Sequence, residues 1–298
     1  MRKTRFFPNR LSPFNYFYKK YRPIRQMKVI THTPSKLLKQ FVKQIWIVEE
    51  NGALNIDLKS FPVGYSFINV IDGNPFSIIN KGNKYQTKSY LAGPKTTFFR
   101  LQMSYIRRAI TIQLKPYSLP YLFNIPASEF YDEIVSLDDF APKLASAIEE
   151  LIASDLTSID VCKRIEDVLL LNLNQEKEDN RVSNALGLIV QSGGNINISD
   201  LSDKVNISQR RLQQLFQYNF GLSAKSYSRI VKMQYHTFQI LKGKDLDEII
   251  PDGYYDQSHY IHELKKQTGL LPNDFHDYIN HETNKMAYLT SNLYFKND

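Results

Sequence analysis

The 298-residue chain is predicted to be an α+β protein, with a small β-barrel or β-sandwich in its N-terminal half and an all-helical domain in its C-terminal half. Short apolar runs separated by turn residues fill residues 41–114, which predicts strands. Apolar positions at helical spacing fill residues 182–280. Two similar patterns of a turn followed by a capped helix occur near the C-terminus, and this repetition indicates two helix-turn-helix units.

The predicted strands are short apolar runs that end at turn residues. Asn51–Gly52 and Gly93–Pro94 are two of these turns, and both dipeptides favour a reversal of the chain. Several short strands with frequent turn signals are typical of a barrel or a sandwich. The expected strands are residues 41–49, 65–71, 76–79, 97–103 and 109–114.

Helical spacing of apolar residues begins after the last strand. Residues 142–153 and 157–173 are predicted to be helices that flank the β-domain. The short polar stretch 175–180 follows them and is the expected linker between the domains. Seven helices are then expected in the C-terminal domain, at residues 182–191, 199–205, 208–220, 223–241, 245–250, 256–268 and 273–280.

Positive charge is concentrated at the N-terminus. Residues 1–28 hold nine Lys and Arg, seven aromatic residues and no acidic residue, whereas the whole chain has a net charge of +8. This composition fits an arm that binds nucleic acid or an anionic membrane surface, and it also fits a disordered segment upstream of a translation start at Met27. The remainder is close to neutral, so a DNA-binding face there must be a local patch. The expected division is an arm at 1–27, a regulatory domain at 28–174, the linker, a DNA-binding domain at 181–282 and a tail at 283–298.

Composition argues against several functional classes. Cys162 is the single cysteine, so a disulfide framework is excluded, a reducing cytoplasmic environment is expected, and its place on an apolar helical stripe predicts burial. No apolar run reaches the roughly 18 residues that a membrane-spanning helix needs, so no membrane partner is expected. His32 is the only histidine of the N-terminal half, so neither a metal nor another cofactor is expected. No catalytic motif is recognisable, and the chain is not expected to be an enzyme.

The first helix-turn-helix unit is predicted at residues 199–220. Leu201 and Val205 on its first helix face apolar residues on its second, Asn206 suits a left-handed turn, and Ser208 suits an N-cap. An ordinary αα-hairpin has the same burial pattern, but the second copy of the pattern favours helix-turn-helix. With the apolar side inward, the outward side chains are groups that hydrogen-bond the edges of bases. They are Gln209, Arg210, Gln213 and Gln214.

Residues 183–282 resemble the DNA-binding domain of the AraC/XylS family of bacterial transcription regulators. The resemblance is carried by the segments Asp200–Ser208, Leu212–Phe216, Phe220–Gly221, Gly253–Tyr260 and Leu264–Pro272. In that family a rigid helix, here expected at 223–241, joins two units whose recognition helices enter successive major grooves of double-stranded DNA. The resemblance therefore implies DNA contacts from Ser208, Gln209, Arg210, Gln213 and Gln214 in the first unit, and from Gln257, Ser258, His259 and His262 in the second.

The second unit departs from the family pattern. The segment before Gly253 is one residue short, and Pro251 disfavours helix at Ile250, so the helix at 245–250 is expected to be short. Glu263 on the recognition helix is expected to repel phosphate. We therefore expect the first unit to supply most of the base specificity.

Part of the N-terminal half is similar to the cupin-like sensor domains of some AraC-type regulators, on the segment Ile110–Phe130. This similarity implies a small barrel that binds a small-molecule effector or controls homodimerisation, with the helices at 142–173 available for pairing. Aromatic residues of the predicted strands are the candidates for lining an effector pocket. They are Trp46, Tyr65, Phe67 and Phe99.

The function expected from these features is sequence-specific DNA binding that is regulated by the N-terminal domain. The alternative is a protein-interaction adaptor that keeps the fold without specific DNA binding. The near-neutral C-terminal domain and the short helix favour the adaptor, whereas Arg210, Gln213 and Gln214 favour the regulator. A cupin-type enzyme fused to a DNA-binding domain lacks metal ligands in the sequence.

Overall fold

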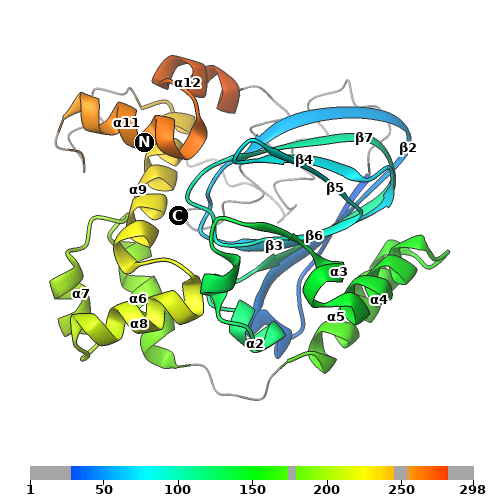
Figure 1. Cartoon of the computed structure of the whole chain (residues 1–298), viewed down its shortest axis with the longest axis horizontal. Coiled ribbons are helices and arrows are strands. Elements are labelled where there is room, and N and C mark those ends of the chain that lie inside the picture. Colours follow the sequence, from blue (N-terminus) through cyan, green and yellow to red (C-terminus); the bar gives the residue numbers. More distant parts are fainter. Residues whose placement is uncertain (1–27, 174–178, 245–253, 255, 281–298) are drawn as a thin grey trace, which may run out of the picture.

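The computed structural model describes residues 28–173, 179–244, 254 and 256–280. These residues form an antiparallel sheet with flanking helices, followed by an all-helical domain (Figure 1). The predicted α+β class is confirmed. The predicted arm with Met27, most of the linker, the helix at 245–250 with Pro251, and the tail lie outside the described residues.

The sheet is eight-stranded in the part of the chain that is described, and every pairing is antiparallel. Its strand order is β1-β2-β7-β3-β6-β8, while β4 pairs with both β5 and β7. The strands are β1 (Lys28–His32), β2 (Val42–Ser60), β3 (Ser66–Gly73), β4 (Phe76–Asn80), β5 (Asn83–Thr87), β6 (Ser89–Ala92), β7 (Phe99–Leu114) and β8 (Ile134–Ser136).

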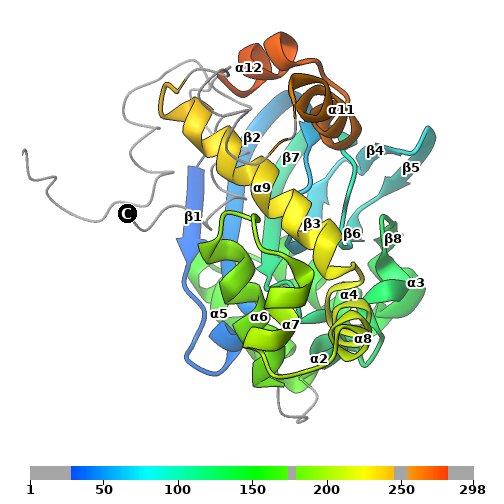
Figure 2. The same cartoon turned by 90° about the vertical axis from the view of Figure 1, so that its left-hand side faces the viewer.

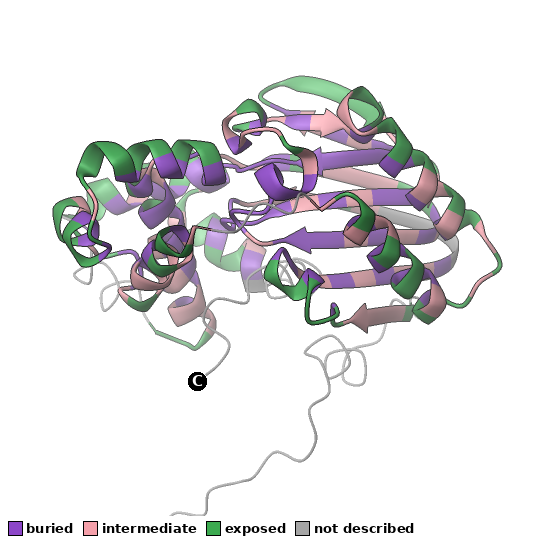
Figure 3. Ribbon diagram, turned by 90° about the horizontal axis from the view of Figure 1, so that it is seen from below, coloured by how far each residue is buried: buried purple, intermediate pink, exposed green. Residues whose placement is uncertain are grey.

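The sheet does not close into the expected barrel. Strands β1 and β8 end the order and do not pair with each other, so the N-terminal domain is a curved open sheet (Figures 1 and 3). Closure of a barrel needs a continuous hydrogen-bonded ladder between its first and last strands. Strand β8 is three residues long and passes directly into α3 (Leu137–Phe140), so it offers few backbone groups for such a ladder.

Strand β7 is continuous, although the sequence pattern predicts two strands in this region. The polar residues between the two apolar runs keep the extended pairing with β2, where Tyr105 pairs with Ala53 and Arg108 with Glu49. Register shifts between Glu49 and Gly52 and between Ala53 and Ile56 mark irregularities that bend such long pairs. One end of β7 therefore pairs with β4 and the other with β3.

Helices α4 (Pro142–Ala153) and α5 (Ser158–Leu171) pack on one face of the sheet. Their apolar sides form a common core with alternate residues of the strands, among them Ile45 and Ile110. Cys162 lies in this core, fully buried as predicted. Burial raises the pKa of its thiol to about 12, so the thiol stays protonated at neutral pH. The smaller elements around this core are 3₁₀-helix η1 (Leu38–Gln40), α2 (Leu119–Phe123) and 3₁₀-helix η2 (Ala127–Phe130).

The helical domain is organised around α9, which crosses it diagonally between two groups of helices (Figure 2). One core lies between the first four helices, and a second lies between the C-terminal half of α9 and the last two helices. The described helices of this domain are α6 (Asn180–Gln191), α7 (Ile198–Lys204), α8 (Gln209–Phe220), α9 (Ala224–Leu241), α11 (Gln257–Thr268) and α12 (Pro272–Asn280).

The sheet domain contacts both groups of helices. On one side, Tyr117 and Tyr121 join the core of α6 to α9, and the Tyr117 ring lies 6.4 Å from that of Phe220. On the other side, the Phe61 ring lies 5.5 Å from the Phe275 ring and 5.3 Å from the Tyr278 ring of α12. The two domains are therefore packed together at two separate places.

Between these two places, the segment that joins β2 to β3 follows α9. The Tyr227 hydroxyl donates a hydrogen bond to the carbonyl oxygen of Gly64 at 3.2 Å. The side-chain amide of Gln234 donates to the carbonyl oxygen of Pro62 at 3.3 Å. In both bonds a side chain of α9 donates to a backbone carbonyl of the segment, so the bonds fix α9 against the sheet domain.

Candidate DNA-binding surface

Helices α7 and α8 form the first helix-turn-helix unit, with the caps that the sequence predicts. Asn206 in the turn has a φ of 55°, in the left-handed region. The Ser208 hydroxyl accepts the backbone N–H of Arg211 at 3.2 Å and caps α8. Gly221 ends the helix with a φ of 64°, a conformation that favours glycine.

The two sides of α8 differ sharply in exposure. Leu212, Leu215 and Phe216 are buried in the domain core. The opposite side is exposed, and it holds all the predicted DNA contacts of this unit, Ser208, Gln209, Arg210, Gln213 and Gln214. The Gln209 amide donates to the Ser199 hydroxyl at 3.2 Å, which ties it to α7. Arg210, Gln213 and Gln214 are spaced so that they lie on one side of the helix.

Helix α9 joins the two units. The Ser223 hydroxyl caps it by accepting the Ser226 backbone N–H at 3.1 Å. Its 18 residues span about 27 Å, and the two units pack against its opposite halves. The helix therefore sets the distance between the two recognition helices.

Helix α11 is the recognition helix of the second unit. An Asp256 carboxylate oxygen accepts the backbone N–H of His259 at 2.7 Å, and Gly269 ends the helix with a φ of 68°. The predicted contacts Gln257, Ser258, His259 and His262 are all exposed. The His259 ring lies 5.5 Å from the Tyr254 ring.

A carboxylate that repels DNA would project toward solvent, but Glu263 does not. It is 8% exposed, and a carboxylate oxygen lies 3.9 Å from a guanidinium nitrogen of Arg229 on α9. Pairing with Arg229 offsets its charge, so the repulsion of phosphate that the sequence suggested is weakened.

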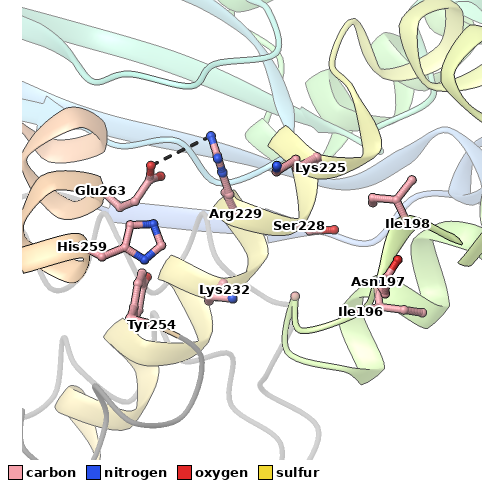
Figure 4. Close-up of a pocket in the computed structure, with 11 residues that line it drawn as sticks. Ile196, Asn197, Ile198, Lys225, Ser228, Arg229, Lys232, Tyr254, His259 and Glu263 are labelled. Carbon is pink, nitrogen blue, oxygen red and sulfur yellow. Dashed lines mark ion pairs between the residues drawn. The ribbon is translucent and has the colours of Figure 1, made fainter. Parts of the chain in front are cut away.

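A cleft separates the two units, and its floor is α9. We call it the interunit cleft. Its volume is about 460 Å³, and Lys225, Arg229 and Lys232 of α9 give it three cations (Figure 4). These three residues were not predicted as functional from the sequence, although their spacing of four and then three residues places them on one side of a helix. The remaining lining residues are Gly194, Ile196, Asn197, Ile198, Ser228, Tyr254, His259 and Glu263.

A family model described as a helix-turn-helix domain matches residues 201–277, the part of the chain that holds α7, α8, α9 and α11. This match is of the AraC type and coincides with both units. The C-terminal part of the chain therefore carries an AraC-type helix-turn-helix domain, a domain that binds DNA. A second model, described as "Domain of unknown function (DUF6597)", matches residues 30–136 and covers the sheet domain.

Solved structures similar to this chain include ToxT from Vibrio cholerae, with a TM-score of 0.42 and 11% identity over 85% of this chain and 98% of ToxT. ToxT bound to an unsaturated fatty acid matches with a TM-score of 0.41 and 12% identity, over 85% of this chain and 95% of that chain. The AraC-like transcriptional activator CuxR matches with a TM-score of 0.24 and 14% identity, over 77% of this chain and 89% of CuxR. A comparison with curated proteins finds no match.

The four aromatic residues predicted to line an effector pocket lie in different surroundings. Trp46 and Phe67 are partly exposed on the sheet face opposite α4 and α5, and their ring centroids are 6.4 Å apart. Phe67 also packs against the buried cluster that contains Phe99. Tyr65 is buried beside Gly64, in the segment that follows α9. The structure therefore brings Trp46 and Phe67 together, places Phe99 behind them and sets Tyr65 apart.

None of the described helices of the chain has the length and apolar character needed to cross a membrane. Among all the residues that the structure describes, no three His, Cys, Asp or Glu side chains gather into a group that could hold a metal ion.

Both recognition helices of the AraC-type domain end against the sheet domain. A Cβ atom at Gly221 would overlap the carbonyl group of Ala127 in η2, and a Cβ atom at Gly269 would overlap the ring of Phe98. At Gly221 both the left-handed backbone and the close approach of the η2 backbone require glycine. At Gly269 the left-handed backbone requires glycine, and the neighbouring atoms belong to the ring of the Phe98 side chain.

Proposed function

We propose that this regulator binds a specific DNA site by placing α8 and α11 in successive major grooves. The observation that carries the proposal is the exposed row of Arg210, Gln213 and Gln214 on a helix whose other side is buried. A guanidinium group pairs with two acceptors of guanine, and a side-chain amide pairs with adenine, so this row has the chemistry for reading bases. Ser208 and Gln209 complete the first contact set, and Gln257, Ser258, His259 and His262 form the second.

The sheet domain, in this proposal, regulates DNA binding by holding a small-molecule effector or by pairing two copies of the chain. Partly exposed Trp46 and Phe67 offer an aromatic surface for an apolar effector. The exposed apolar side chains of Ile159 and Leu171 on α5 offer a surface for a second copy. Packing of the sheet domain against both units gives either input a route to the recognition helices.

Selection of bound fragments from genomic DNA, followed by titrations of the selected site and of unrelated DNA, tests the proposal. We expect at least about a thousandfold preference for the selected site and a steep fall of affinity with salt. Comparable weak binding to all DNA would instead support the adaptor, a protein-binding module that keeps the fold without specific recognition.

A further inference from the structure

The residues that line the interunit cleft carry more positive than negative charge. Lys225, Arg229 and Lys232 project from successive turns of α9, and Glu263 is the one carboxylate among the residues that line the cleft (Figure 4). Glu263 lies close to Arg229, so the net charge of the lining remains positive. The Lys232 ammonium lies 5.6 Å from the centre of the Tyr254 ring, a distance that fits a cation–π contact. The cleft is therefore suited to an anion.

A buried hydroxyl in the same cleft supports a ligand there. Ser228 lies on α9 between Lys225 and Lys232, it is 6% exposed, and it lines the cleft. Its Oγ has no hydrogen-bond partner among the described residues. Leaving a buried hydroxyl unpaired is unfavourable, so such a group is commonly satisfied by a ligand or by water. The Ser228 hydroxyl is placed to donate a hydrogen bond to a phosphate oxygen in the cleft.

The walls of the cleft come from both helix-turn-helix units. Asn197 and Ile198 stand at the start of α7, the first helix of the first unit, and His259 stands in the first turn of α11 (Figure 4). In helix-turn-helix complexes the first helix of a unit crosses the DNA backbone, while the recognition helix lies in the groove. The cleft thus opens beside one element that meets the backbone and one that meets the bases.

We propose that the interunit cleft binds a backbone phosphate of the DNA strand that passes between the two major grooves, through Lys225, Lys232 and the hydroxyl of Ser228. This inference rests on the proposed function, because it requires α8 and α11 to lie in successive grooves of one duplex. It assigns to α9 a binding role in addition to its role as a spacer. Such a contact adds affinity without sequence preference and fixes the DNA between the two units.

The test is the salt dependence of DNA affinity for the full-length chain with both lysines neutralised. Lys225→Gln with Lys232→Gln is compared with Lys84→Gln plus Lys163→Gln, which removes the same charge from exposed positions of the sheet domain. We expect the cleft pair to weaken binding to specific and unrelated DNA alike, by roughly tenfold per lysine at about 50 mM salt. The slope of log Kd against log salt should fall by about 2, whereas the control pair should leave it unchanged.

Ser228→Ala provides a second variant that should fold normally. It removes a hydroxyl without a partner, so thermal stability should be unchanged or higher, while DNA affinity should fall by about tenfold. Loss of affinity together with loss of stability would indicate a structural role for Ser228 and contradict the proposal. The three variants together therefore separate a phosphate contact from general damage to α9.

Three outcomes overturn the assignment in distinguishable ways. Wild-type slopes in the cleft variants, with the site preference intact, would exclude the cleft and leave the proposed function standing. A stabilisation by inorganic phosphate that disappears in the cleft variants, with unchanged DNA affinity, would assign the cleft to a free phosphate compound. A wild-type chain that prefers no DNA site would exclude both the proposed function and this role of the cleft.

Discussion

Arg210 and His262 allow base recognition by the two units to be compared at single residues, because each is exposed on its own recognition helix. We expect Arg210→Ala to cost about 1–3 kcal/mol at the selected site and to relax the preference at one base position. His262→Ala should cost less, since an imidazole lacks the two parallel donors of a guanidinium group. Titrations against the site and its single-base variants measure both effects.

Arg181→Ala is the control for this comparison. Arg181 is exposed at the start of α6, where it pairs with Asp179 at 2.7 Å, and it lies outside both recognition helices. Its removal should leave the base preference intact. Equal losses from Arg210→Ala and His262→Ala would show that the two units contribute equally, against the expectation from the sequence.

Lys95 is a buried cation whose titration should be visible in the stability of the protein. Burial lowers the pKa of its amine to about 8, against an opposing attraction from Asp132. Between that value and the ordinary 10.5, the unfolded chain binds more protons than the folded chain, so the free energy of unfolding rises with pH. Relative to Lys95→Met, wild type should gain up to about 3 kcal/mol across this range.

Urea unfolding of both proteins at about pH 7 and about pH 10 measures the gain attributed to Lys95. The Lys95 ammonium hydrogen-bonds the side-chain oxygen of Asn80 at 2.8 Å and the carbonyl oxygen of Asp132 at 2.6 Å, so the substitution removes two defined bonds. A stability difference that does not change with pH would mean that the amine keeps its proton throughout.

At the scale of elements, the helices were predictable because their signals are local. Ser208 and Asp256 cap α8 and α11 as N-caps, and Gly221 and Gly269 end the same helices, all from sequence signals of three or four residues. The exposed row on α8 was equally predictable, since apolar spacing alone defines its buried side. The interunit cleft was not predictable, because it depends on how α7 and α11 are placed relative to α9.

The strands were predicted less completely, for reasons that differ between them. Strand β5 is exposed along nearly its whole length and β6 is buried along all of its length. Neither strand therefore shows the alternation of buried and exposed residues by which a strand is predicted. The sequence of β7 contains two apolar runs separated by polar residues, so its pattern predicts two strands. Pairing with β2 keeps the polar middle extended, and this pairing is not visible in the local sequence. Whether the sheet closes depends on β1 and β8, which lie about a hundred residues apart, and no local pattern determines their distance.

Helix α11 carries the prediction at this scale, through its N-cap. Asp256→Ala should cost about 1 kcal/mol of stability and speed the hydrogen exchange of the His259 amide, which the Asp256 carboxylate accepts at 2.7 Å. Asp256→Asn should retain most of the stability and most of the protection of the His259 amide from exchange, because an amide oxygen caps a helix nearly as well as a carboxylate. Asp277→Ala, at an exposed position of α12, is the control. A His259 amide that exchanges at the wild-type rate in Asp256→Ala would contradict the role of this cap.

At the scale of the whole molecule, Phe61 couples the two domains through its contacts with Phe275 and Tyr278. We expect Phe61→Ala to uncouple their unfolding, because each aromatic pair contributes about 0.5–1.5 kcal/mol. Trp46 is the only tryptophan and lies in β2, so its fluorescence reports on the sheet, while far-UV circular dichroism reports mainly on helices. The two denaturation curves should coincide in wild type and separate in Phe61→Ala.

Phe123→Ala is the matched control for the coupling by Phe61. Phe123 packs against Phe130 and Phe140 in the sheet domain. Its truncation should destabilise that domain without breaking the contact to α12, so both denaturation curves should shift together. Curves that remain superimposed in Phe61→Ala would mean that other contacts suffice to couple the domains.

The glycines that end the two recognition helices have a consequence for the geometry of the operator. Because Gly221 abuts η2 and Gly269 abuts Phe98, the angle between α8 and α11 is held by the sheet as well as by α9. A support at two points resists torsion about the long axis of α9. One base pair inserted between the two half-sites rotates one against the other by about 35°. Such a rotation of one half-site against the other should weaken DNA binding strongly. The spacing of the half-sites should therefore limit which DNA sites are bound as much as their sequence does.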